Sequence, residues 1–157
     1  MDLHGQSHDH RHQLGYVLNA ADLCCTDAVL DEGPLRDKCT LRAACCSEHP
    51  RLSQVVRGLA SLGALLETRG CPCVPSPSSP EPGDACKCYF NGGYNTKQAA
   101  SGAFIALQIE SAFVGARDSP ENITKFAGHL ADSLMAFTAL HLPSYCPTAR
   151  SDVVALV

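Results

Sequence analysis

The cysteine content of this chain constrains its fold more than any other feature. Ten of the 157 residues are cysteines, an even number and a high one for a protein kept reduced in the cytosol. We therefore expect disulfides, and with them a secreted or luminal protein; the sequon Asn122–Thr124 is compatible with that. Two alternatives stay open: free thiols, and a zinc site built from two Cys-x-Cys pairs. The ten are Cys24, Cys25, Cys39, Cys45, Cys46, Cys71, Cys73, Cys86, Cys88 and Cys146.

The first residues of the chain do not fit secretion. Residues 1–5, Met-Asp-Leu-His-Gly, lack the apolar core of a signal peptide. We therefore expect a secreted or luminal protein only if a signal peptide lies upstream of Met1, and a cytoplasmic protein otherwise. No apolar run approaches the ~18 residues of a membrane helix, so no membrane partner is expected. The net charge is −4 and no basic stripe exists, so no nucleic-acid partner is expected either.

Apolar periodicity predicts two helices and one buried strand. Apolar residues recur at helical spacing over residues 52–66 and again over residues 123–137. Residues 103–110 alternate between two faces that are both apolar until the last three positions, as in a central strand. Gln108 and Glu110 then emerge on one face at its carboxyl end. In open α/β sheets that end is where ligands bind.

Sequence composition divides the remainder of the chain. We expect one domain over residues 1–142, followed by a C-terminal tail, 143–157. Residues 24–50 hold five cysteines and charges of both signs without a clear period, which predicts an irregular Cys-rich excursion. Residues 71–88 are rich in proline and predict a loop anchored by a cysteine pair at each end. The expected class is α/β, with a mixed sheet flanked by helices and a Cys-rich loop insertion.

The histidine-rich start of the chain suggests metal chemistry. His4 follows a short apolar strand and lies near Asp2, a pairing that suits a zinc ligand and the carboxylate that orients it. His8 is a further candidate ligand. The alternative is a solvated, histidine-rich terminus with no ligand role.

Two further stretches could complete an active site. Glu110, at the end of the buried strand, could act as a general base on a metal-bound water. Residues 92–94, Gly-Gly-Tyr, with the nearby Lys97, could line a pocket in which the lysine holds a substrate carboxylate. The alternatives are an ordinary acid at a strand end and a structural turn.

Four segments in order resemble the N-formylglutamate amidohydrolase family, which belongs to the zinc carboxypeptidase and aspartoacylase-like superfamily. Asp-Leu-His-Gly-Gln-Ser-His at 2–8, with Leu-Gly-Tyr at 14–16, resembles the family's metal-histidine strand and its following loop. Ser-Leu-Gly-Ala-Leu-Leu-Glu at 61–67, with Val-Pro-Ser-Pro at 74–77, resembles a helix and proline loop of its eukaryotic members. Residues 90–97 resemble its Gly-Gly-Tyr motif, and residues 106–110 its late strand with the catalytic glutamate.

The resemblance implies part of a zinc-carboxypeptidase-like fold and a hydrolase of linear amide C–N bonds. The implied substrate is a small-molecule N-acyl amino acid such as N-formyl-L-glutamate. The implied cofactor is zinc, with His4 as the last zinc-ligating histidine and Asp2 behind it. Glu110 would be the general acid/base, and Lys97 would face the substrate carboxylate. The remaining residues implied to line the substrate site are Gly93, Tyr94, Asn95 and Gln108.

The chain also departs from the family pattern. The family's first two ligands, a histidine and an acid, precede the Asp-x-His strand, so the other zinc ligands are expected upstream of Met1. We therefore expect this chain to be a fragment that is inactive alone. Residues 98–100, Gln-Ala-Ala, replace the family's basic or aromatic residues and glycine. Two alternatives follow: a non-catalytic, disulfide-stabilised binding domain derived from that family, or an unrelated Cys/His metal-binding module.

Overall fold

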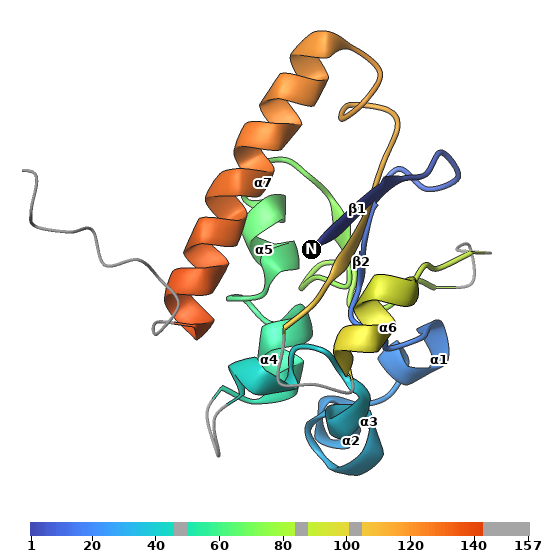
Figure 1. Cartoon of the computed structure of the whole chain (residues 1–157), viewed down its shortest axis with the longest axis vertical. Helices are drawn as coiled ribbons and strands as arrows, with labels where there is room; N and C mark the ends of the chain where they lie inside the picture. Colours follow the sequence, from blue (N-terminus) through green and yellow to red (C-terminus); the bar gives the residue numbers. More distant parts are fainter. Residues whose placement is uncertain (46–49, 84–87, 101–104, 143–157) are drawn as a thin grey trace, which may run out of the picture.

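A computed structural model describes residues 1–45, 50–83, 88–100 and 105–142 (Figure 1). Its centre is a four-stranded mixed sheet with helices beside it, which confirms the expected mixed α/β class. The sheet order is β1-β4-β2-β3. The strands are β1 (Asp2–Gly5), β2 (His12–Gly15), β3 (Cys73–Val74) and β4 (Gln108–Ser111).

Strand β4 lies between β1 and β2 and is buried throughout. It runs parallel to β1 and antiparallel to β2, while β2 runs parallel to β3. The prediction of a buried strand here is correct in kind but wrong in extent. The strand begins at Gln108, which pairs with Asp2 on β1 and with Gly15 on β2, and the Asp2 N–H donates to the Leu107 carbonyl just before it. Residues 101–104 lie outside the described part.

The predicted helix over residues 52–66 is two helices, α4 (Leu52–Arg57) and α5 (Leu62–Glu67). Gly58 ends α4 with an extended backbone, ψ −179°. Ser61 begins α5, and its side chain accepts a hydrogen bond from the Ala64 N–H. The apolar spacing did not reveal the break between the two helices, because each helix buries apolar residues of the same series.

The second predicted helix, α7 (Pro120–His141), forms as expected. Ser119 caps it by accepting a hydrogen bond from the Asn122 N–H, with Pro120 in the first turn. Its buried face includes Phe126 and Phe137, which pack into the core. No helix in the described part of the chain has the length and apolar character needed to span a membrane.

The excursion predicted over residues 24–50 is more regular than expected. Its described part contains α2 (Asp27–Asp31), α3 (Gly33–Lys38) and a 3-10 turn (Arg42–Ala44), after the short helix α1 (Ala20–Leu23). The prediction missed these helices because each is too short to show an apolar period.

Apolar packing and Arg57 hold this region to the body of the protein. Leu30 and Leu41 are fully buried in the core. The Arg57 side chain donates to the carbonyls of Leu23 and Cys25, at 2.6 and 2.7 Å. It also pairs with the Asp27 carboxylate at 2.7 Å.

Four of the cysteines are free thiols: Cys25, Cys39, Cys71 and Cys73. Burial raises the pKa of Cys39 to about 12, so this thiol stays neutral at physiological pH. Cys46, Cys86 and Cys146 lie outside the described residues, so the disulfide framework and the four-cysteine zinc site both stay predictions.

Candidate functional site

The two faces of the sheet differ in chemistry around β1 and β4. The register pairs Asp2 with Gln108 and His4 with Glu110, so these four side chains share one face. On the other face Ile109 is fully buried in the core. Residues about a hundred positions apart in the sequence therefore meet on one polar face, which we call the Asp2–Glu110 face. It comprises Asp2, His4, Gln108 and Glu110.

On β1, a carboxylate orients the histidine. His4 Nε2 lies 3.0 Å from Asp2 Oδ1, and the His4 side chain is half-exposed. The other carboxylate oxygen, Asp2 Oδ2, accepts a hydrogen bond from Asn95 Nδ2 at 3.3 Å. A carboxylate on one ring nitrogen fixes the ring and makes the other nitrogen more basic. This leaves His4 Nδ1 as the ring nitrogen that could bind a metal ion.

On β4, an amide holds the glutamate. Gln108 Nε2 donates to Glu110 Oε1 at 2.8 Å, and Glu110 is buried. Gln108 Oε1 in turn accepts the backbone N–H of Gly93. This arrangement fixes the Gln108 amide at both ends and leaves Glu110 Oε2 for a proton or a ligand.

The Gly-Gly-Tyr loop supplies the backbone that reaches this face. A Cβ atom on Gly93 would lie 2.8 Å from Gln108 Oε1, too close for any other residue without a shift. Gly92 has a φ of +131°, which favours glycine. Helix α6 (Tyr94–Ala100) begins directly afterwards. The second glycine is thus needed for close approach to Gln108, and the first for the turn.

The predicted substrate residues take two different positions. Asn95 and Gln108 use their amide groups within the protein, on Asp2, Glu110 and Gly93. Lys97 is exposed on α6, one turn after Gly93, whose carbonyl accepts the Lys97 N–H at 3.0 Å. Tyr94 is also exposed. The structure therefore leaves Lys97 and Tyr94 facing solvent near the site.

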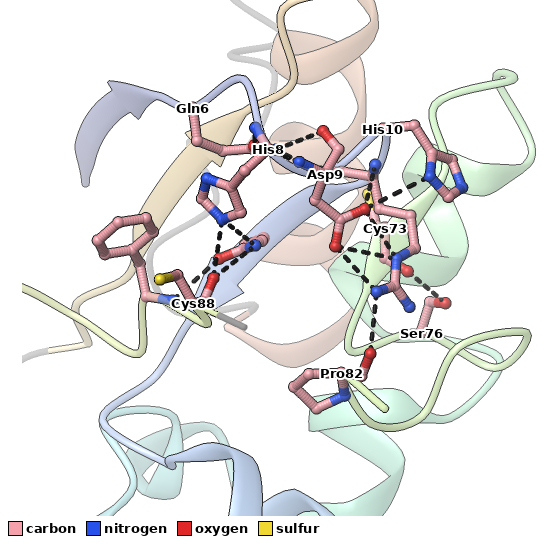
Figure 2. A network of polar contacts seen from close by, with 11 residues as sticks. Gln6, His8, Asp9, His10, Cys73, Ser76, Pro82 and Cys88 are labelled. Atoms are coloured by element: carbon pink, nitrogen blue, oxygen red, sulfur yellow. Dashed lines mark hydrogen bonds and ion pairs between the residues drawn. The ribbon is translucent and has the colours of Figure 1, made fainter. Parts of the chain in front are cut away.

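His8 belongs to a separate network (Figure 2). Its Nε2 lies 2.8 Å from the Cys88 carbonyl oxygen and 3.3 Å from Gln13 Nε2, and its ring packs on Phe90. Gln13 also bonds the backbone of Cys88 and Phe90. His8 therefore attaches the segment before the Gly-Gly-Tyr loop to β2. Its polar partners differ from that of His4, which is Asp2.

The loop between β1 and β2 is fixed by polar contacts that the sequence analysis missed. Gln6 Oε1 accepts the N–H groups of His8 and Asp9, and its Nε2 donates to the carbonyls of Asp9 and Arg11. Arg11 pairs with Asp9 at 2.8 Å and donates to the Pro82 carbonyl, as Figure 2 shows. Burial would raise the pKa of Asp9, but hydrogen bonds and charge from Arg11 lower it overall. The loop thus holds the end of β1, and with it His4, in place.

The described residues do not make up a whole zinc site. Catalytic zinc takes three protein ligands and a water. Within the described ranges no group of three or more His, Cys, Asp or Glu side chains is placed to hold a metal ion. His4 fits a ligand supported by Asp2, whereas Glu110 is held by Gln108. Other ligands would have to come from outside the described residues.

Comparison of the chain with protein-family models, curated proteins and solved structures gives no match.

Proposed function

We propose that the Asp2–Glu110 face is part of a zinc-dependent amidohydrolase site that cleaves an N-acyl amino acid such as N-formyl-L-glutamate. The observation that carries this proposal is the convergence of an oriented histidine and a buried, fixed glutamate on neighbouring strands. The proposed fold is part of a zinc-carboxypeptidase-like sheet. The four-stranded mixed sheet is compatible with such a fold.

In this proposal His4 is one ligand of the zinc ion, and the ligands that complete the site lie outside the described residues. Zinc would polarise the acyl carbonyl and acidify a water molecule. Asp2 holds the His4 ring in the orientation that presents Nδ1. Asn95 donates to the other oxygen of the Asp2 carboxylate and so helps to keep this carboxylate against His4 Nε2.

Glu110 moves the proton. Its Oε2 takes a proton from the attacking water as the new C–O bond forms. The same oxygen then gives that proton to the amide nitrogen as the C–N bond breaks, so the products are a free amine and a carboxylic acid, which loses its remaining proton to solvent. Gln108 keeps the Glu110 carboxylate aimed throughout, because its own amide is fixed by the Gly93 N–H. Lys97, which is exposed on α6, would pair with the substrate carboxylate.

The experiment measures formate release from N-formyl-L-glutamate by the protein from its natural source, with zinc supplied. We expect release that a chelator stops. Glu110→Gln, introduced into the same gene, should lower kcat at least ~100-fold, the range of a lost general base. His10→Gln is the matched control, because the His10 side chain is 83% exposed.

The second candidate is a binding domain without hydrolysis. The observation that favours it is the commitment of the Asn95 and Gln108 amides to protein partners, which leaves fewer groups for a substrate. Absence of formate release by the protein from its natural source, with zinc supplied, would support this candidate and refute the hydrolase. Formate release that needs Glu110 would refute this candidate.

A further inference from the structure

An apolar groove with a volume of about 540 Å³ lies between β1 and α7. It is on the face of β1 that carries Leu3, and so opposite the Asp2–Glu110 face, because successive residues of a strand point to opposite faces. Leu3 and Ile123, which line it, are 52% and 51% exposed. Small-molecule pockets have volumes of about 300–1,000 Å³ and mainly apolar walls. The main apolar lining is Met1, Leu3, Ile123, Ala127, Leu130 and Leu134.

One cation, Arg117, is held rigidly at one end of this groove. Its Nε donates to the Ser111 carbonyl at 3.3 Å, and its Nη2 donates to the Gln6 carbonyl at 2.8 Å. Gly5 makes room for it, because a Cβ atom on Gly5 would overlap the guanidinium carbon. The guanidinium therefore has a fixed position where β1 and β4 end.

The charge of Arg117 is not balanced within the described part of the chain. Its Nη1 makes no hydrogen bond there, and no described carboxylate pairs with it. Among the described residues that line the groove it is the only charged side chain. A guanidinium binds a carboxylate through parallel hydrogen bonds. The groove thus combines an extended apolar wall with one site for an anion.

We propose that the groove binds a free, unbranched aliphatic carboxylate. The carboxylate pairs with Arg117, and the alkyl chain lies along Leu3 toward Met1, under α7. Gly5 lies four residues after Met1, about 13 Å along a strand. An extended decanoate ion has about this length, and we therefore use it as the probe.

The charges around the groove favour a free acid over a membrane surface. Proteins bind anionic membranes through clusters of Lys and Arg, whereas this groove has the single cation Arg117. The next charged residues along the chain, Asp118 and Glu121, are acidic and exposed. They would repel an anionic bilayer, while a single carboxylate can still reach the guanidinium from within the groove.

The test is calorimetric titration of the protein from its natural source with decanoate, below its micelle concentration and without added zinc. We expect about one bound decanoate per chain. Arg117→Gln, introduced into the same gene, should weaken decanoate binding about 10–100-fold, the range of a lost charged hydrogen bond. Binding of decan-1-ol, which has the same alkyl chain without the charge, should change little in this variant.

A second variant is needed because Arg117→Gln also removes two hydrogen bonds within the protein. Ala131 lines the groove and is exposed on α7, so Ala131→Trp fills the groove from outside the core. It should abolish the binding of both decanoate and decan-1-ol. Ala139→Trp is the matched control, because Ala139 is exposed on α7 outside the groove lining, and it should bind decanoate as the wild type does.

Four results would overturn the proposal. Two are decanoate affinity that is unchanged in Arg117→Gln, or unchanged in Ala131→Trp. The third is binding to phosphatidylglycerol vesicles without uptake of free decanoate. The fourth is self-association that Ala131→Trp abolishes, again without uptake of decanoate, because a second copy would then cover the groove. No zinc or N-acyl amino acid is present, so failure here is distinct from failure of the proposed hydrolase.

Discussion

Acidification should destabilise this protein through one buried histidine, His12. Its ring is 3% exposed and stacks on Phe126, with 4.3 Å between ring centroids. Its Nδ1 accepts the Ala112 N–H at 3.2 Å, so this nitrogen carries no proton. Burial lowers the pKa of His12 to about 4, and the positive charge of Arg117 adds to the effect.

Proton linkage gives both the direction and the size of this change in folding stability. In the unfolded chain His12 binds a proton below about pH 6.5, whereas in the folded protein it does so only near pH 4. Between these values the unfolded state holds more protons, so stability falls as the pH falls. At about pH 4.5 the two pKa values give a loss of about 2.5 kcal/mol relative to neutral pH.

The assay is urea unfolding of the wild type and of His12→Phe at about pH 7 and about pH 4.5. The substitution keeps a stacking ring and removes the titration. Both proteins lose stability from their carboxyl groups, and we expect the wild type to lose about 2.5 kcal/mol more. The control His10→Gln should lose as much as the wild type, because His10 is exposed. Equal losses in wild type and His12→Phe would refute the reasoning.

Three substitutions test other parts of the structure by the same unfolding assay. Gly93→Ala should cost about 1–3 kcal/mol, since its Cβ would lie 2.8 Å from Gln108 Oε1; no loss would contradict the close approach of this loop. Gly128 is exposed on α7, and a Cβ atom added there would meet no atom within 4 Å. Gly128→Ala should therefore stabilise the protein by about 0.5–1 kcal/mol, and a loss of stability would argue against a helix there. Arg57→Ala should cost about 2–3 kcal/mol by leaving the Leu23 and Cys25 carbonyls unpaired; an unchanged midpoint would refute its role.

The sequence was most informative where local pattern and long-range position agree. Ser119 and Pro120 fix the start of α7. The sequence also predicts Gln108 and Glu110 on one face of a buried strand, and the register confirms it, although Gln108 begins β4 and does not lie near its carboxyl end as predicted. Asp2 and Glu110 were predicted as parts of one site, and the register of β1 with β4 brings them to one face.

Other features depend on contacts that no local pattern reveals. Helix α4 ends at Gly58. A single glycine can also occur inside a helix, so this residue alone does not predict the break. The sequence also does not say whether an amide faces a ligand or the protein. The sequence predicts that Gln108 lines the substrate site. In the structure its amide accepts the Gly93 N–H and donates to Glu110, because the Gly-Gly-Tyr loop approaches β4 closely. Gln6 carried no signal except its place after the Asp-x-His strand.

The most direct test of the central claim is zinc titration, by calorimetry, of the protein from its natural source, with the His4 ring followed by NMR. The proposed site predicts about one zinc ion per chain, a shift of the His4 ring resonances, and loss of binding in His4→Ala. His10→Ala should bind as the wild type does. Zinc binding that survives His4→Ala, or no binding at all, would contradict the assignment of the Asp2–Glu110 face as a metal-hydrolase site.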